Sequence, residues 1–179
     1  MMTTPEEEDF FLSHININSS VLEYGSGAST LQIARRAGYV VSVEHNKEWY
    51  DKAANGEQYR NMTVLYAQQN KEMPNGYSDG SDEEFYDYVR APWGFLTFNV
   101  VLIDGRARMA CVRHLVENQE HYFGSVGTPT IFIHDCTPSA DILIDREKDE
   151  RVELKSNEAY RYLTKVGGVG TMMRFRLKE

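Results

Sequence analysis

Two segments of the chain are apolar at almost every position, and they constrain the fold more than any other feature of the sequence. Residues 98–103 read FNVVLI and residues 130–134 read TIFIH. A strand that is apolar on both faces is buried under helices on both sides, which is the environment of a strand in a parallel sheet. These two segments therefore predict central strands of a helix-covered, parallel sheet.

The rest of the chain supplies the alternating elements that such a sheet requires. Strands are expected at residues 20–24, 39–44 and 62–67, and helices at 5–13, 29–37, 47–54 and 109–123. This alternation of strand and helix is the pattern of right-handed βαβ units. Residues 171–177 (TMMRFRL) follow a glycine-rich turn and are expected to add an antiparallel C-terminal strand. The predicted fold class is α/β, doubly wound, with a mostly parallel sheet.

The composition favours one acidic domain. The chain has 179 residues, of which 41% are hydrophobic, and a formal net charge of −8. No repeat or long linker divides it, so residues 1–179 are expected to form a single domain. An acidic surface repels phosphate backbones, which disfavours a nucleic-acid partner.

The location of the protein is also an expectation from sequence. No segment has the roughly 20 consecutive apolar residues that a membrane-spanning helix needs, so no membrane partner is expected. The first nine residues lack the apolar run of a signal peptide. A cytoplasmic location is therefore expected, with Cys111 and Cys136 as thiols.

The turn after the first expected strand is rich in glycine and follows an acidic residue. Residues 23–30 read EYGSGAST, and glycine at positions 25 and 27 allows a tight turn and a close approach of the backbone to a ligand. Glu44 ends the next strand, 21 residues after Glu23. This spacing is close to the roughly 20 residues typical of a carboxylate that binds a ribose. The turn and Glu44 together predict a site for a nucleoside-containing cofactor.

Two details of the turn discriminate between cofactors. A dinucleotide fingerprint has a third glycine three residues after the second, where this chain has Thr30. Glu23 would repel a pyrophosphate, whereas it suits a ligand with a cationic amino-acid head. S-adenosylmethionine carries both an ammonium group and a ribose. It is therefore the favoured cofactor, and a nucleotide-dependent oxidoreductase is the disfavoured alternative.

The segments VLEYGSGAST (21–30) and VVSVEHNKEWY (40–50) resemble the first two motifs of class I S-adenosylmethionine-dependent methyltransferases. IDGRARMAC (103–111) and the later HD pair resemble a small group within that family. The resemblance implies the Rossmann-like methyltransferase fold, a glycine loop around the methionine part, and a ribose held by the acid of the second strand. The cofactor-binding residues expected from this resemblance and from their place at strand ends are Glu23, Tyr24, Gly25, Ser26, Gly27, Ser29, Glu44, His45, Gln68 and Asp104.

Polar residues also follow the two central strands, where ligands of open α/β sheets bind. The candidate catalytic residues are Asp104, Arg106, His134 and Asp135. In one interpretation Asp104 lies near the sulfonium or amino group of the cofactor, and His134 or Asp135 removes a proton from an acceptor hydroxyl. In the other, Asp104 and Asp135, with or without His134, hold Mg²⁺ or Ca²⁺ as in metal-dependent O-methyltransferases.

Each of these residues also has a purely structural interpretation. Asp104 would cap the following helix or pair with Arg106, and His134 would be a hydrogen-bonded core histidine. Arg106 and Arg108 would either bind an acidic substrate group or neutralise nearby acids. In the long connection 68–97, an aromatic stretch around residues 85–89 is expected to form the buried face of a helix, and residues 78–84 are expected to be solvated.

The activity expected from these observations is methyl transfer from S-adenosylmethionine to an oxygen of a small molecule, such as a sugar or a phenol. A non-catalytic S-adenosylmethionine-binding protein and a protein methyltransferase are the alternatives. The short segment before the first strand leaves little material for a substrate domain. The site is therefore expected to be open, or to be completed by a second copy in a homo-oligomer.

Overall fold

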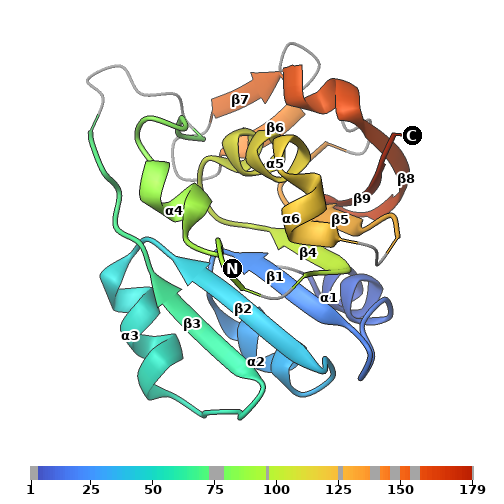
Figure 1. Ribbon diagram of the computed structural model, residues 1–179. Helices are drawn as coiled ribbons and strands as arrows, with labels where there is room; N and C mark the ends of the chain where they lie inside the picture. Colours follow the sequence, from blue (N-terminus) through green and yellow to red (C-terminus); the bar gives the residue numbers. More distant parts are fainter. Residues whose placement is uncertain are drawn as a thin grey trace.

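The computed structural model describes residues 4–72, 79–95, 97–124, 127–137, 142–145, 150–153 and 158–178. Its main sheet has seven strands in the order β3-β2-β1-β4-β5-β9-β8, and β6 and β7 form a separate hairpin (Figure 1). The strands are β1 (Ser20–Tyr24), β2 (Tyr39–Glu44), β3 (Met62–Tyr66), β4 (Val100–Ile103), β5 (Thr130–Ile133), β6 (Ile142–Asp145), β7 (Glu150–Glu153), β8 (Leu163–Val169) and β9 (Met172–Leu177). The helices are α1 (Pro5–Leu12), α2 (Ala28–Ala34), α3 (Lys47–Asn55), α4 (Tyr86–Arg90), α5 (Arg108–Glu117), α6 (Gln119–Phe123) and the 3₁₀ helix η1 (Glu158–Tyr162).

The pairing of the strands confirms the predicted fold class. β1 pairs in parallel with β2 on one side and with β4 on the other, β2 with β3, and β4 with β5. β9 runs antiparallel to β5, and β8 antiparallel to β9. The strand order therefore reverses between β1 and β4, which is the switch point where open α/β sheets bind ligands.

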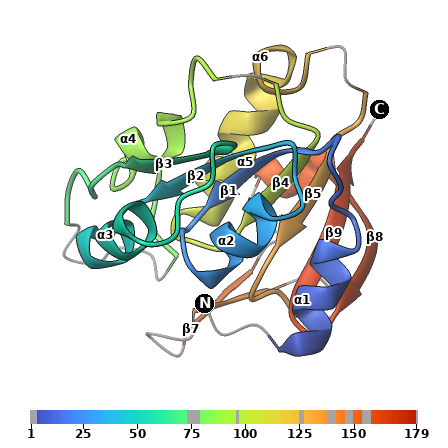
Figure 2. The same ribbon diagram turned by 90° about the horizontal axis from the view of Figure 1, so that it is seen from below.

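Helices cover both faces of this sheet, with α1 and α2 on one face and α4, α5 and α6 on the other (Figures 1 and 2). Successive residues of a strand point to opposite faces, so each central strand contributes to two apolar layers. On the α1–α2 side the strands contribute Val21, Val40, Val100, Leu102 and Phe132. On the α4–α5 side they contribute Leu22, Tyr24, Val41, Val43, Val101, Ile103, Ile131 and Ile133. Among the described residues, no helix is long and apolar enough to cross a membrane.

The helix expected at residues 109–123 is two helices in the structure. Asn118, between α5 and α6, has φ −121° and ψ 32°, outside the helical region, and its side-chain amide donates to the His114 carbonyl oxygen. Asparagine competes for backbone hydrogen bonds in this way, which explains the break. In the glycine-rich tail, Gly167 and Gly168 lie within β8, and the turn expected there is made by Gly170 and Thr171.

One glutamate, Glu7, stabilises the start of the N-terminal helix and also joins the inner face of this helix to the turn between β8 and β9. Thr4 and Glu7 form a capping box, with the Thr4 N–H donating to Glu7 Oε2 at 2.8 Å. The second oxygen, Oε1, accepts the backbone N–H of Thr171 at 2.5 Å and its hydroxyl at 2.8 Å. A Cβ at Gly170 (φ +56°) would lie 2.4 Å from this oxygen, so the β8–β9 turn fits around the carboxylate. Glu7 therefore ties α1 to the far end of the chain.

These contacts predict a specific acid sensitivity. Burial raises the pKa of Glu7, but hydrogen bonds from Thr4 and Thr171 and the charge of His134 outweigh it, and the pKa falls to about 2. The stabilisation is present above the unfolded-state pKa of 4.5 and is lost as the pH falls toward 2. We expect Glu7→Gln to be less stable than wild type near neutrality, with the difference shrinking by about 2 kcal/mol between about pH 6 and about pH 3.

Urea unfolding across this pH range measures the difference. Glu6→Gln is the matched control, because Glu6 lies on the exposed side of the same helical turn. An equal pH dependence of the two variants would contradict the role given to Glu7.

Candidate functional site

The loops that follow β1 and β4 touch each other through two glycines. Gly25 has φ +100°, and a Cβ there would lie 2.7 Å from the Gly105 nitrogen and 2.8 Å from its Cα. The Asp104 N–H donates to the Tyr24 carbonyl oxygen at 2.9 Å, which locks the two loops in register. Glycine is required at position 25 both by the positive φ and by this close approach. The glycine turn is therefore held directly against the loop that carries Asp104.

Glu23 lies on the α2 side of the sheet and is fully enclosed. Its carboxylate accepts hydrogen bonds from the hydroxyls of Ser29 (2.5 Å), Thr30 (2.6 Å) and Ser42 (2.6 Å). Ser29 and Thr30 begin α2, so Glu23 anchors the start of this helix to the strands. Three hydroxyls therefore surround the carboxylate that is expected to face the cationic head of a ligand.

Glu44, at the end of β2, joins the same network. Its oxygens accept the backbone N–H groups of Ser26 (2.8 Å) and Asn46 (2.7 Å). The Ser26 and Ser42 hydroxyls are 2.8 Å apart, and Ser42 also bonds Glu23, so a chain of hydrogen bonds links the two glutamates. The structure thus brings both acids to one edge of the sheet, on neighbouring strands.

A surface cleft of about 630 Å³ lies beside Glu44 at the ends of β2 and β3. Its wall includes His45 and Gln68, two of the residues expected to bind the cofactor, together with Tyr66 and Asn70. The Tyr24 side chain does not reach this edge, because its hydroxyl donates to the Val89 carbonyl oxygen within the core. A direct role of Tyr24 is therefore confined to its backbone.

Four side chains from three distant parts of the chain meet at the ends of β4 and β5. His134 Nδ1 donates to Asp104 Oδ1 at 2.6 Å, and it lies 3.8 Å from Asp135 Oδ1. On the other side of the imidazole, Nε2 is 3.6 Å from Glu7 Oε2. The His134 side chain is 3% exposed, whereas that of Asp135 is 19% exposed. Asp135 has φ +57°, an uncommon conformation for a residue with a side chain.

The charges around His134 set its protonation. Burial lowers the pKa of His134, but the hydrogen bond to Asp104 and the charges of Asp104, Asp135 and Glu7 outweigh it, so that the pKa is raised. The imidazole is therefore biased toward its charged form near neutral pH. The His134 imidazole is also 3% exposed, so an acceptor hydroxyl reaches it less readily than it reaches Asp135.

Arg108 and Asp79 form a buried ion pair next to this cluster. Arg108 Nε donates to Asp79 Oδ1 at 2.6 Å, and Nη1 donates to the His134 carbonyl oxygen at 2.9 Å. Nη1 is also 3.9 Å from Asp135 Oδ2. Of the two interpretations of Arg108, the structure favours neutralisation of nearby acids. Arg106, on the same loop, is partly exposed.

Two acids of this site were missed by the sequence analysis. Glu7 lies in the first turn of the helix expected at 5–13, and nothing local indicates its contact with residue 134. The expectation that residues 78–84 are solvated is wrong for Asp79 and Glu84, which are 3% and 5% exposed. Asp79 is buried because Arg108 pairs with it, and Glu84 because it accepts the Ser81 N–H.

The interpretation of Phe85 and Val89 as buried residues is confirmed.

The expected divalent cation fits this cluster poorly. One ligand atom each of Asp104, His134 and Asp135 lies within 4.8 Å of the others, which is a separation suited to a metal ion. However, the Asp104 and His134 atoms bond each other, and the Arg108 cation stands beside Asp135. Mg²⁺ and Ca²⁺ prefer sets of oxygen ligands, whereas one of these three ligand atoms is an imidazole nitrogen.

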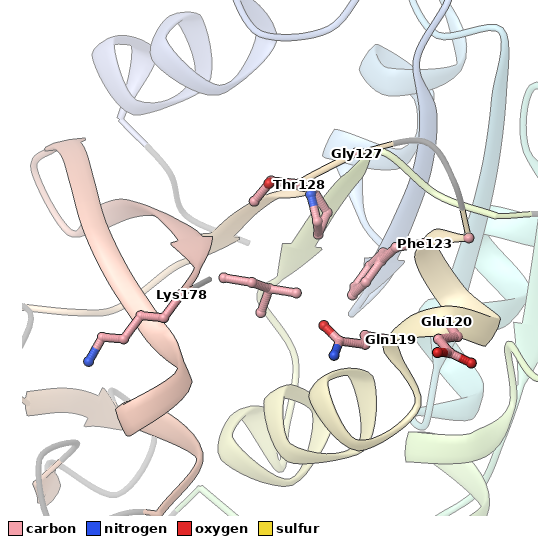
Figure 3. Close-up of a pocket in the computed structure, with 9 residues that line it drawn as sticks. Gln119, Glu120, Phe123, Gly127, Thr128 and Lys178 are labelled. Carbon is pink, nitrogen blue, oxygen red and sulfur yellow. The ribbon is translucent and has the colours of Figure 1, made fainter.

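A second hollow, of about 410 Å³, lies at the opposite edge of the sheet. Its wall is formed by residues just before β5 and just after β9, together with α6. Figure 3 shows the Phe123 ring and the Gln119 amide lining it, while the Lys178 side chain extends away. The cluster of Asp104, His134 and Asp135 lies elsewhere, at the ends of β4 and β5, so this hollow is not the candidate site.

Comparison with known proteins finds neither a matching family model nor a matching curated sequence. Solved structures share the fold. A methyltransferase-like protein from Silicibacter pomeroyi has 24% identity and a TM-score of 0.64, over 99% of this chain and 88% of that chain. The N-methyltransferase NodS from Bradyrhizobium japonicum, in complex with S-adenosyl-L-homocysteine, has 12% identity and a TM-score of 0.59, over 97% and 85%. A tRNA (m1A58) methyltransferase from Aquifex aeolicus has 14% identity and a TM-score of 0.55, over 99% and 70%. The chain therefore has the Rossmann-like fold of these methyltransferases.

The enclosed carboxylate of Glu23 predicts an unusual pH dependence of stability. Burial raises its pKa to about 7, although the hydroxyls of Ser29, Ser42 and Thr30 partly oppose the shift. The folded state then binds a proton more tightly than the unfolded state, so this carboxylate lowers stability as the pH rises from 4.5 to about 7. We expect Glu23→Gln to gain about 2 to 3 kcal/mol relative to wild type between about pH 5 and about pH 8.

The measurement is urea unfolding of both proteins at the two pH values. A constant difference between them would show that Glu23 does not titrate in this range and would contradict the assignment.

Proposed function

We propose that this chain is a methyltransferase that transfers a methyl group from S-adenosylmethionine to an oxygen of a small molecule. The observation that carries the proposal is the direct contact between the loops after β1 and β4. It places the Glu44 carboxylate and its cleft on one side of the switch point and the Asp104–His134–Asp135 cluster on the other. A cofactor that spans these loops would present its reactive end to the cluster.

The expected cofactor-binding residues divide into two groups under this proposal. Glu44 accepts two backbone N–H groups and retains lone pairs for the ribose hydroxyls, while His45 and Gln68 border the cleft for the adenine. Gly25, Ser26 and Gly27 approach the cofactor through their backbone. Glu23 and Ser29 act indirectly, because their side chains bond each other and hold the start of α2.

When bound, S-adenosylmethionine supplies an electrophilic methyl group. His134 and Asp135, at the end of β5, are the two candidates for the group that removes the acceptor proton. Asp135 is the more exposed of the two candidates, and His134 is biased toward the charged form. We assign the base to Asp135, which accepts the proton of the acceptor hydroxyl as its oxygen attacks. His134 holds the position of Asp135 through its charge, and Asp104 fixes the imidazole.

The acceptor is assigned from charge. The chain carries a net charge of −8, which opposes a long polyanion such as tRNA. Arg106 is partly exposed beside the cluster and suits contact with an acidic group of a small acceptor. A methyl-transfer assay with sugars, phenols, tRNA and a protein substrate separates these classes, and methylation of tRNA or protein alone would overturn the small-molecule assignment.

The first test is cofactor binding by isothermal titration calorimetry. We expect S-adenosylmethionine and S-adenosylhomocysteine to bind with micromolar affinity, and NAD not to bind. Glu44→Gln should weaken binding at least about tenfold, because the amide replaces an acceptor with a donor. Glu48→Gln, on the exposed start of α3, is the matched control. Binding of NAD but not of S-adenosylmethionine would refute the proposal.

The second test is turnover. We expect Asp135→Asn to lower kcat by roughly 10²- to 10⁴-fold, because the proton acceptor is removed, while the cofactor affinity stays near that of wild type. The measurement is formation of S-adenosylhomocysteine with saturating acceptor. Asp51→Asn, in the exposed pair with Lys47, is the control.

Removal of divalent cations by chelation tests the alternative that the cluster is a metal site. Since the cluster fits a divalent cation poorly, we expect EDTA to leave turnover unchanged. Loss of turnover with EDTA and its return with Mg²⁺ would replace the general-base assignment by a metal site. A chain that binds cofactor but methylates no class of acceptor would instead be a non-catalytic binding protein.

A further inference from the structure

One buried tyrosine at the candidate site has a hydroxyl with no hydrogen-bond partner among the described residues. Tyr88, on α4, is fully buried, and its hydroxyl oxygen is unpartnered. Enclosing a hydroxyl without a partner costs free energy, so such a group needs an explanation in the function of the site.

Two other buried tyrosines show how unusual this is within the chain. The Tyr24 hydroxyl donates to the Val89 carbonyl oxygen at 2.8 Å, and the Tyr122 hydroxyl lies 3.0 Å from His114 Nε2. Tyr24 packs against Tyr88 with ring centroids 5.5 Å apart, so the two share one environment. The environment therefore permits a partnered hydroxyl, and Tyr88 lacks one because of where its oxygen is directed.

The Tyr88 oxygen is directed at the contact between the two loops. A Cβ at Gly105 would lie 2.1 Å from it, so it rests on the backbone of that residue, which in turn touches Gly25. The Tyr88 ring is edge-on to the His45 ring, with centroids 5.7 Å apart, and His45 lines the cleft beside Glu44. His45 thus lies between Tyr88 and the cleft, and Tyr88 lies between the strand ends that carry Glu44 and Asp104.

We propose that the Tyr88 hydroxyl binds the cofactor by donating a hydrogen bond to an oxygen of its ribose, with the His45 ring turning aside as the ligand enters. This inference rests on the proposed function. Glu44 and Asp104 are carboxylates that accept the protons of ribose hydroxyls, and Tyr88 is the donor beside them from which a ribose oxygen can accept. The charges of Glu44 and Asp104 also contribute to a raised pKa of Tyr88, together with the larger effect of burial, which keeps the donor protonated.

The test compares Tyr88→Phe with wild type, because phenylalanine keeps the ring and removes only the oxygen. We expect the affinity for S-adenosylhomocysteine to fall about tenfold, the usual effect of losing one hydrogen bond from a ligand. The ligand-free variant should be at least as thermostable as wild type, because an unpartnered hydroxyl is removed. Tyr122→Phe is the matched control, expected to lose stability and to keep its affinity, since its hydroxyl is already bonded to His114.

A second ligand tests whether the Tyr88 hydroxyl contacts the ribose or another part of the cofactor. 5′-Methylthioadenosine has the ribose but lacks the amino-acid part, so Tyr88→Phe should weaken its binding by the same factor. Weakened binding of S-adenosylhomocysteine alone would overturn the ribose contact. Unchanged affinity for both ligands, or a loss of stability in the ligand-free variant, would overturn the proposal for Tyr88. Absence of binding to wild type would instead overturn the proposed function.

Discussion

The close approach of Gly25 and Gly105 is the constraint on which the rest of the site depends. A Cβ at Gly25 would lie 2.7 Å from the Gly105 nitrogen, and a Cβ at Gly105 would lie 3.1 Å from the Gly25 backbone and 2.1 Å from the Tyr88 hydroxyl. Their contact occurs between β1 and β4, where the strand order of the sheet reverses. As a result, the glycine turn before α2 and the polar residues after β4 and β5 form one continuous edge.

Buried charge is the second organising feature of this edge. Glu7, Asp79, Arg108 and His134 are all nearly inaccessible to solvent, and an isolated charge there would be very costly. Each is compensated by a specific partner, as in the Asp79–Arg108 pair and the Asp104–His134 hydrogen bond. Removing one partner of such a pair leaves the other uncompensated. The network therefore favours a single arrangement of the strand ends, with Asp135 as its most exposed carboxylate.

The hydrogen-bonded hydroxyls around Glu23 show how an acid in the glycine-turn motif holds the surrounding structure. Ser29 and Thr30 bring the first turn of α2 onto this carboxylate, and Ser42 ties it to β2. The acid before the glycine turn thus shapes the loop and fixes the start of α2. Glu44 holds the neighbouring loops in the same way, because its oxygens accept the Ser26 and Asn46 N–H groups and Oε1 lies 3.1 Å from His45 Nδ1.

The sequence by itself determined the elements and their order. The strands at 20–24 and 39–44 and the glycine turn depend on neighbouring residues, whose alternation and φ preferences are local properties. Because parallel strands end at a common edge of the sheet, the sequence also predicted that Glu44, Asp104 and His134 lie at the same edge. Only the tertiary structure decided that Glu7 reaches His134, that Asp79 is buried against Arg108, and that the Tyr88 oxygen is directed at Gly105. Each of these contacts joins side chains from separate elements, and their meeting depends on how helices pack on the sheet, which no local pattern encodes.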